Sequence, residues 1–272
     1  MKSFHRRTSR PAPHPAVVAA PAVHRDGLRA DQLLVERGLA PSRTVAQRLI
    51  EAGRVSWSEG PIGKPSIVLP LSADLHVIDD DLDRYVSRGG TKLAGALKHT
   101  GVDVNGRICL DVGQSTGGFT DCLLQAGAAG VVGVDVGHGQ LHPRLRADPR
   151  VTCIENVNAR ELGKSAVAAR HYGHYGLIVG DLSFISLTLV LPQLPALLAE
   201  DGDMLLLVKP QFEVGPENVG KGGIVRDASL YPAVEARLRE AAAAAGLSVV
   251  DYFDSPITGA DGNREFFIWT RK

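Results

Sequence analysis

From Ile108 onward, short apolar segments alternate with amphipathic ones, and this alternation restricts the fold more than any other feature of the chain. The apolar segments span residues 108–112, 131–136, 151–155, 177–181, 204–209, 248–253 and 266–270, and we expect helices at 119–125, near 165–170, around 189–199 and at 231–245. Apolar strands separated by helices are typical of a mostly parallel, doubly wound α/β sheet. The last two expected strands adjoin without a helix, so one of them should be antiparallel.

A smaller unit should precede this sheet, since 272 residues is about 1.8 times the length of a typical domain. Residues 28–38 and 42–53 have the apolar spacing of two short helices, and Ser42 can cap the second. Residues 54–57, 67–69 and 75–78 resemble short strands, and an acidic run at 79–83 marks a boundary. We predict a small α+β domain at 27–78, a linker at 79–88 and an α/β domain at 89–272, which opens with a helix running to His99.

Several protein classes are disfavoured by composition. No apolar run is long enough to span a membrane. Residues 1–26 are basic and then apolar, as in a signal peptide, but four prolines interrupt them, which favours a flexible tail. The three cysteines stand singly, so neither a disulfide framework nor a zinc site is indicated, and a reducing cytoplasm fits.

The formal net charge is zero, but the charges are unevenly distributed. Residues 1–110 hold 16 Lys and Arg against 11 Asp and Glu, whereas residues 111–272 hold 14 against 19. This excess of positive charge permits a nucleic-acid partner for the first half without requiring one.

The first domain resembles the S4 RNA-binding module over about fifty residues. The resemblance is carried by Leu28-Arg29-x-Asp31-x-x-Leu34, Gly38, Ser42-Arg43, Ala46, Ile50, Gly53-x-Val55 and Gly63-Lys64-Pro65-Ser66. It implies binding of folded RNA through Arg29, Arg43, Arg48, Arg54 and Lys64, because arginine offers paired donors to phosphates. Arg84 and Arg88, near the start of the second domain, are further candidates. The alternative is a helical pair with solvated arginines.

A glycine-rich turn follows the first strand of the α/β domain. It reads Asp111-Val112-Gly113-Gln114-Ser115-Thr116-Gly117-Gly118-Phe119-Thr120, and Asp135 ends the next strand. Glycines bring backbone N–H groups close to a ligand, and an acidic residue about twenty positions later can accept two ribose hydroxyls, so a dinucleotide or S-adenosylmethionine is indicated. The DxGxxxGG spacing and the antiparallel ending favour S-adenosylmethionine and the class I methyltransferase fold. Asn158 is a candidate contact to the adenine or a plain loop cap.

Two polar side chains, Asp181 and Lys209, close apolar strands. A lysine in this position must be desolvated or paired, which indicates either a structural ion pair or a site. A second glycine-rich stretch, residues 215–222, departs from the phosphate-binding loop pattern at Gly222, and we interpret it as a loop beside the site.

Residues 84–272 resemble the FtsJ-type ribose 2′-O-methyltransferases, and with the S4 module in front the chain resembles the TlyA family of rRNA methyltransferases, whose members are often labelled hemolysins. The resemblance implies a catalytic tetrad of Lys92, Asp181, Lys209 and Glu265. It also implies a cofactor site made by Asp111, Gly113, Ser115, Thr116, Gly117, Gly118, Phe119, Asp135, Asn158 and Asp181. Gln114 replaces the alanine usual in the family, and the adenine segment is Asn156-Val157-Asn158.

The expected reaction is in-line transfer of a methyl group to the ribose 2′-oxygen of cytidine in 16S rRNA, with 23S rRNA as a further candidate. Lys209 would bind and help to deprotonate the hydroxyl, Lys92 would favour its neutral form through like charge, and two carboxylates would orient the lysines. The residues 84–87 are candidates for coupling RNA binding to cofactor binding.

Other activities fit the sequence less well. Amino-group methylation needs an Asn/Asp-Pro-Pro-aromatic segment and cytosine C5 methylation a cysteine, whereas the fourth strand is followed by Asp181-Leu182-Ser183-Phe184. A ribosome-binding assembly factor with an inactive methyltransferase half is the main alternative. A cytolysin is less favoured, since no membrane-inserting segment is visible.

Overall fold

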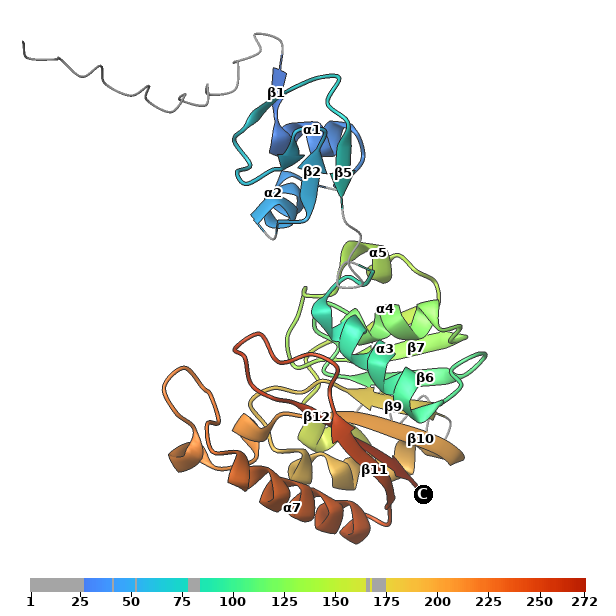
Figure 1. Cartoon of the computed structure of the whole chain (residues 1–272). Helices are drawn as coiled ribbons and strands as arrows, with labels where there is room; N and C mark the ends of the chain where they lie inside the picture. Colours follow the sequence, from blue (N-terminus) through green and yellow to red (C-terminus); the bar gives the residue numbers. More distant parts are fainter. Residues whose placement is uncertain (1–26, 41, 52, 78–83, 165–166, 168–174) are drawn as a thin grey trace, which may run out of the picture. The chain divides into compact units, whose positions relative to one another are not determined.

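The computed structural model describes residues 27–40, 42–51, 53–77, 84–164, 167 and 175–272 (Figure 1). The expectations for residues 1–26, for the acidic run and for most of the helix near 165–170 lie outside these residues. The chain divides into two compact units, Met1–Asp79 and Asp80–Lys272.

The first unit is α+β, as predicted. Its elements are β1 (Gly27–Arg29), α1 (Ala30–Glu36), α2 (Arg43–Glu51), β2 (Val55–Trp57), β3 (Gly60–Pro61), β4 (Val68–Pro70) and β5 (Leu75–Val77). β1 pairs with β4, and β2 lies between β3 and β5. Leu34, Ile50, Ile62 and Leu69 form the centre of its core and are essentially inaccessible to solvent. The first helix starts later than expected because residues 27–29 pair as a strand.

The second unit is built on a seven-stranded sheet in the order β11-β12-β10-β9-β6-β7-β8. Its elements are α3 (Arg88–Thr100), β6 (Ile108–Val112), α4 (Gly118–Gln125), β7 (Gly130–Val134), α5 (Pro143–Arg146), β8 (Val151–Ile154), β9 (Tyr175–Gly180), β10 (Leu198–Val208), α7 (Tyr231–Ala244), β11 (Ser248–Asp254) and β12 (Phe266–Arg271). The chain runs outward from β6 to β8 and then returns to β9 on the other side of β6. This switch point places a ligand crevice beyond the carboxyl ends of β6 and β9.

The prediction of one antiparallel strand at the end of the sheet is confirmed. β12 is antiparallel to both β10 and β11, whereas the pairs of β6 with β7 and β9, β7 with β8 and β9 with β10 are parallel. The fold is that of the class I methyltransferases.

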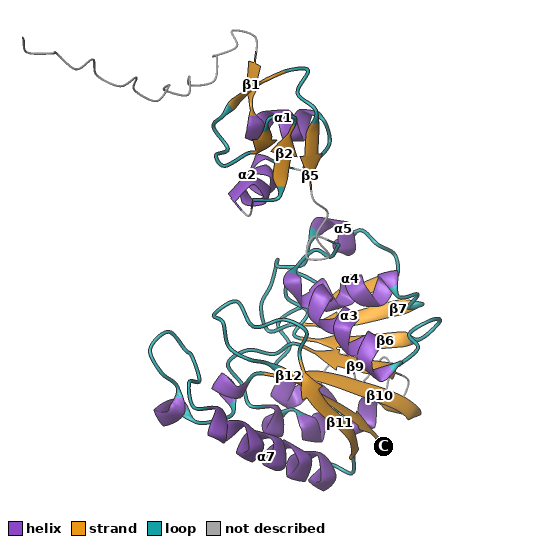
Figure 2. Cartoon of the chain, viewed as in Figure 1, coloured by secondary structure: helices purple, strands orange, loops and turns teal. Residues whose placement is uncertain are grey.

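Helices cover both faces of the sheet (Figure 2). α3 and α4 pack together on one face, where Leu93 and Leu123 meet Leu205, Leu207 and Phe267. α7 covers the other face of the sheet. Leu206, which lies between Leu205 and Leu207 on β10, belongs to the hydrophobic core on that face. This period of two is the reason that β10 reads as continuously apolar.

The prediction of a helix around residues 189–199 is wrong. Three short 3₁₀ turns, Leu187–Leu189, Leu191–Gln193 and Pro195–Leu197, take its place, and β10 already begins at Leu198. Pro192 and Pro195 lack the N–H group that an α-helix needs at each interior position, so the apolar residues pack on the sheet without a continuous helix.

The predicted linker at 79–88 is too long. Tyr85 is buried in the core of the second unit, and the N–H group of Val86 donates to Asp121 Oδ2 at 2.9 Å. Arg84 Nε donates to Gln125 Oε1 on α4 at 3.2 Å. Residues 84–88 therefore belong to the second unit, which the buried ring of Tyr85 anchors.

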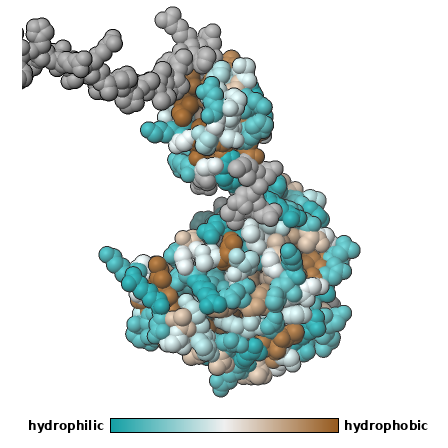
Figure 3. All heavy atoms as spheres, in the orientation of Figure 1, coloured by the Kyte–Doolittle hydropathy of each residue, from teal (hydrophilic) through white to brown (hydrophobic). Residues whose placement is uncertain are grey.

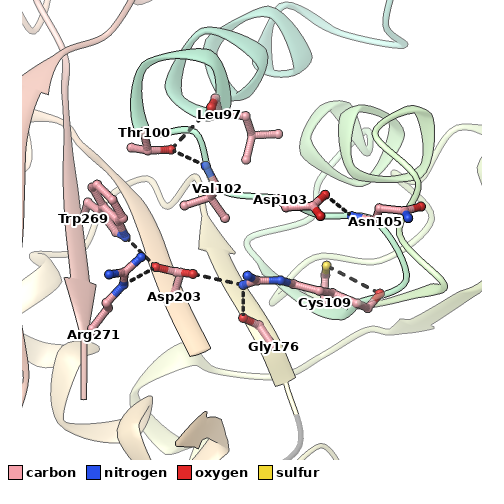
Figure 4. A network of polar contacts seen from close by, with 11 residues as sticks. Leu97, Thr100, Val102, Asp103, Asn105, Cys109, Gly176, Asp203, Trp269 and Arg271 are labelled. Carbon is pink, nitrogen blue, oxygen red and sulfur yellow. Dashed lines mark hydrogen bonds and ion pairs between the residues drawn. The ribbon is translucent and has the colours of Figure 1, made fainter. Parts of the chain in front are cut away.

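A polar network closes the edge of the sheet where the parallel strands begin (Figure 4). The buried carboxylate of Asp203 accepts hydrogen bonds from Trp269 Nε1 at 2.8 Å, Arg271 Nε at 2.7 Å and Arg107 Nη1 at 3.0 Å. Burial acts to raise the pKa of Asp203, but these bonds lower it below its usual range. The network joins β10 and β12 to the start of β6, and leaves the opposite edge for ligands.

On the face of the protein drawn in Figure 3, hydrophobic residues appear as small separated spots among hydrophilic ones. In the part of the chain that the structure describes, no helix is long and apolar enough to cross a membrane.

Candidate active site

The turn after β6 approaches the end of β9 closely. Gly113 has φ +85°, and a Cβ atom on it would lie 2.7 Å from the carbonyl oxygen of Asp181. Ser115 also has a positive φ, and its N–H group donates to Asp135 Oδ2 at 2.7 Å. Since other residues are strained in this conformation, the turn depends on glycine at 113 and on the Asp135 carboxylate at 115.

Two cavities lie on either side of this turn. The first, of about 250 Å³, is lined by Ser87, Gly89, Gly113, Gln114, Ser115, Thr116, Gly118, Phe119, Asp181, Ser183 and Lys209. The second, of about 550 Å³, is lined by residues that include Asp135, Gln140, Asn158, Asp181 and Phe184. Both have Gly113, Ser115, Asp181 and Ser183 in their walls, so together they form an elongated crevice at the switch point.

Asp135 and Asn158 line the larger cavity while also bracing their own loops. Asp135 Oδ1 accepts the N–H of Gly137 at 2.7 Å, in addition to the bond from Ser115. Asn158 Oδ1 accepts the N–H of Arg160 at 3.0 Å. Asn158 thus combines the two interpretations that its sequence position left open, a cavity wall and a loop cap.

Two residues expected at the cofactor, Asp111 and Gly117, are not among the lining residues of either cavity. A Cβ atom on Gly117 would collide with Leu141 and Leu145, so this glycine serves packing. Asp111 is fully buried beneath the turn, where its Oδ2 accepts a hydrogen bond from Thr120 Oγ1 at 2.7 Å. Burial raises the pKa of Asp111 to about 7.

Gln114 completes this buried network. Its Nε2 donates to Thr120 Oγ1 at 2.9 Å, and its side chain occupies the space above Gly133, where a Cβ atom would lie 2.0 Å away. The glutamine therefore fits because β7 has a glycine opposite it.

The predicted tetrad forms two ion pairs. Lys209 Nζ lies 2.5 Å from Asp181 Oδ1 and donates to Ser183 Oγ at 2.9 Å. Lys92 Nζ, on α3, lies 2.6 Å from Glu265 Oε2, just before β12, and both side chains are buried. Each lysine thus has its own carboxylate.

A third cavity, of about 510 Å³, connects the two pairs. Its lining includes Lys92, Glu265, Lys209, Ser183 and Phe184. Lys209 also lines the first cavity and Phe184 the second, so all three cavities meet around the loop that follows β9.

Phe184 is unusual for a large apolar side chain. It is 88% exposed, its φ is +62°, and its ring lies 5.2 Å from that of Phe212 in a tilted arrangement. An exposed aromatic ring on a strained backbone is a feature of binding sites. The sequence reasoning missed it, although an aromatic residue three positions after the polar end of a strand is a usable signal.

The glycine-rich loop at 215–222 lies beside the third cavity, which Val219 and Gly222 help to line. Asn263 is buried and fixes the end of this loop, accepting from the N–H of Val225 at 3.0 Å and donating to the carbonyl of Gly223 at 2.8 Å. The loop is therefore tied to the turn that carries Glu265.

Comparison with known proteins agrees with this geometry. The FtsJ-like methyltransferase family matches residues 85–272, and the S4 domain matches residues 28–66. The 16S/23S rRNA (cytidine-2′-O)-methyltransferase TlyA of Mycobacterium tuberculosis is 46% identical over 243 residues, which are 89% of either chain. The chain belongs to the TlyA family of FtsJ-like methyltransferases.

Other relatives carry a different name. Hemolysin A of Brachyspira hyodysenteriae is 38% identical over 239 residues, 88% of this chain and 98% of that one. A solved structure described as a hemolysin from Streptococcus thermophilus has a TM-score of 0.69 and 39% identity, covering 91% of this chain and 89% of that one. The match to the FtsJ-like methyltransferase family begins at residue 85, in agreement with the packing of Tyr85 in the second unit.

The crevice fits S-adenosylmethionine, the methyl donor of this TlyA-family enzyme. Gly113 keeps the turn free of a side chain where it approaches Asp181, and the larger cavity is lined by the carboxylate of Asp135 together with apolar residues such as Val136 and Ile185. The smaller cavity, next to Lys209, has the size and polar lining for the methionine part.

The candidate RNA-binding residues fall in both units. In the first unit, Arg29 and Arg43 pair with Asp31, Arg48 lies in α2, Arg54 precedes β2 and Lys64 is exposed. In the second unit, Arg84 lies over the ring of Tyr85, and Arg88 Nη2 donates to the carbonyl of Thr258 at 2.9 Å. Arg84 and Arg88 are exposed. Ser87, between them, lines the smaller cavity.

Proposed function

We propose that this TlyA-family enzyme transfers a methyl group from S-adenosylmethionine to the ribose 2′-oxygen of cytidine in 16S rRNA, and that 23S rRNA is a second substrate. Its place of action is then the cytoplasm, where ribosomes are. The observation that carries the proposal is the pair of Lys209 and Asp181 at the junction of the cofactor crevice and the third cavity. The name of the M. tuberculosis relative supports the choice of nucleotide and RNA.

The third cavity has the chemistry of a ribose-binding site. S-adenosylmethionine supplies a methyl group on a positively charged sulfur, and a ribose hydroxyl must lose its proton as it attacks. Lys209 Nζ is held by Asp181 and by Ser183 Oγ, so its position is fixed from two sides. The pair takes up the proton of the 2′-hydroxyl, and the charge at Nζ stabilises the oxygen as the proton leaves.

Lys92 and Glu265 form the opposite wall of the third cavity. Because both are buried and paired, they supply a fixed dipole at low cost in reorganisation. Lys92 contributes a second positive charge near the reacting oxygen, and Glu265 keeps it oriented. Proton uptake is thus assigned to the pair of Lys209 and Asp181, and positioning to the pair of Lys92 and Glu265.

Phe184 fits the base of the target nucleotide. Its exposed ring borders the third cavity, and aromatic side chains stack on single-stranded or flipped bases. A cytidine stacked there would bring its ribose toward Lys209.

The test is transfer of labelled methyl from S-adenosylmethionine to separated 30S subunits, 50S subunits and free rRNA, followed by alkaline hydrolysis. A 2′-O-methyl group removes the hydroxyl that attacks the phosphate, so the modified linkage should resist alkali. Label that confers resistance supports the proposal and identifies the subunit.

Three outcomes would favour the alternatives. Absence of label with normal S-adenosylmethionine binding would favour an RNA-binding assembly factor. Label in alkali-labile RNA would show base methylation. Release of haemoglobin from erythrocytes by the purified protein would favour the cytolytic activity that the name of the Brachyspira relative denotes.

A further inference from the structure

A single buried carboxylate holds two exposed arginines in the first unit. Asp31 lies in the first turn of α1 and its side chain is fully buried. It accepts hydrogen bonds from Arg29 Nε at 2.9 Å and Nη2 at 3.2 Å, from Arg43 Nη2 at 3.0 Å and from Gln47 Nε2 at 2.9 Å. The side chains of Arg29 and Arg43 are 40% and 51% exposed, so each guanidinium contacts both the carboxylate and solvent.

Backbone hydrogen bonds hold the turn that contains Lys64 against the start of α1. The N–H group of Asp31 donates to the carbonyl of Pro65 at 3.2 Å, and that of Ala30 donates to the carbonyl of Ile67 at 2.8 Å. Lys64, which is exposed, directly precedes Pro65. The turn at 64–67, which contains Lys64, is therefore held by its backbone against the start of α1.

The burial of Asp31 has a physical cost that these bonds offset. A buried carboxylate destabilises a small domain unless it is paired. The hydrogen bonds from Arg29, and then those from Gln47 and Arg43, hold the pKa of Asp31 far below its usual range, so it is ionised at neutral pH. An arginine already fixed loses less side-chain entropy when it binds a phosphate.

We propose that Asp31 is a positioning residue for RNA binding, which fixes Arg29 and Arg43 as a pair whose remaining N–H donors contact neighbouring phosphates of structured RNA. Each guanidinium has five N–H donors, and the bonds to Asp31 use two on Arg29 and one on Arg43. This inference rests on the proposed function, since it requires the first unit to contact ribosomal RNA.

The direction in which one substitution changes the affinity for RNA tests the proposal. Asp31→Asn makes the first unit more positive by one charge, which by itself would tighten RNA binding. If Asp31 positions the arginines, the same variant should bind 30S and 50S subunits about tenfold more weakly. The matched control is Asp74→Asn, which makes the same charge change at an exposed aspartate paired only with His76 among the described residues, and should not weaken binding.

The measurement is filter binding of the full-length protein from about 50 to 200 mM salt, together with steady-state methyl transfer. Asp31→Asn should raise the KM for the subunit and leave kcat and the affinity for S-adenosylmethionine unchanged. Binding as tight as wild type, or tighter, would overturn the proposal.

A second variant serves if Asp31→Asn does not fold. The double replacement Arg29→Lys and Arg43→Lys keeps both charges and changes only exposed side chains, but lysine cannot make the paired bonds to the carboxylate. We expect binding about tenfold weaker than wild type, and unchanged binding would contradict the proposal. Failure of the wild-type protein to methylate any subunit would instead contradict the proposed function, whatever Asp31 does to RNA affinity.

Discussion

Glu213 accepts a hydrogen bond from Ser186 Oγ at 2.6 Å, and this contact joins the loop after β10 to the loop after β9. The other oxygen of the same carboxylate accepts the N–H of Leu187 at 2.7 Å, and Glu213 is buried. Since Lys209 begins one of these loops and Asp181 the other, we expect Glu213 to influence the geometry of this proposed catalytic pair without touching it.

Replacing Glu213 should therefore affect both stability and rate. Glu213→Ala leaves the hydroxyl of Ser186 and the N–H of Leu187 without their acceptor, which should lower the free energy of unfolding by about 2–4 kcal/mol. We expect kcat to fall at least about tenfold as the loops separate. Urea unfolding and single-turnover methyl transfer measure the two effects. Glu217→Ala, at an exposed glutamate a few residues later, is the control and should change neither.

Lys209→Ala should abolish methyl transfer, with a loss of about a thousandfold or more, because both the positive charge and the proton path at the 2′-oxygen are removed. The affinity for ribosomal subunits should stay nearly intact. Lys98→Ala, which changes an exposed lysine on α3, should leave transfer unchanged. Appreciable turnover by Lys209→Ala would refute the assigned role.

Phe184 should contribute to RNA affinity through stacking. Phe184→Ala should reduce kcat/KM for the RNA about 10- to 100-fold, in line with about 1–3 kcal/mol for a base stacked on an aromatic ring. Phe184→Trp should retain most activity, whereas Phe184→Leu should resemble Phe184→Ala. Equal activity of the leucine and wild-type enzymes would argue against stacking.

Asp111 should make the stability of the second unit depend on pH. Burial raises its pKa to about 7 in the folded state, so between about pH 4 and pH 7 the folded protein keeps a proton that the unfolded chain has lost. Its contribution to stability is complete below about pH 4 and falls as the pH rises to about 7, by up to about 4 kcal/mol.

Asp111→Asn removes this titration while keeping an acceptor for the hydroxyl of Thr120. The stability of wild type relative to this variant should decrease from about pH 4 to about pH 7 in urea unfolding. Parallel pH profiles for the two proteins would show that Asp111 does not titrate in this range.

The sequence was sufficient for the sheet and for much of the site because both depend on local pattern. Apolar runs ended by Asp181 and Lys209 identify strand ends, and strand ends of a parallel sheet meet at one edge. Glycines at 113 and 118 mark the turn for a similar reason. The TlyA-family resemblance supplied Lys92 and Glu265, which no local pattern distinguishes.

Other features depend on contacts between distant segments. Asp111 has the same local context as a ligand-binding aspartate, and only the packing of Thr120 and Gln114 above it shows that it is buried. Asp31 has the position of an ordinary acidic residue in the first turn of a helix, and its arginine partners come from β1 and α2. The hydrogen-bond partners of Asp111 and Asp31 are therefore evident only in the folded chain.

The bond between Trp269 and Asp203 also has an optical consequence. The chain has two tryptophans, Trp57 in β2 of the first unit and Trp269 in β12 of the second. Because the indole N–H of Trp269 donates to a buried carboxylate, its fluorescence should change when β12 leaves β10. A Trp57→Phe protein would then report unfolding of the methyltransferase unit alone, and Trp269→Phe would report the RNA-binding unit.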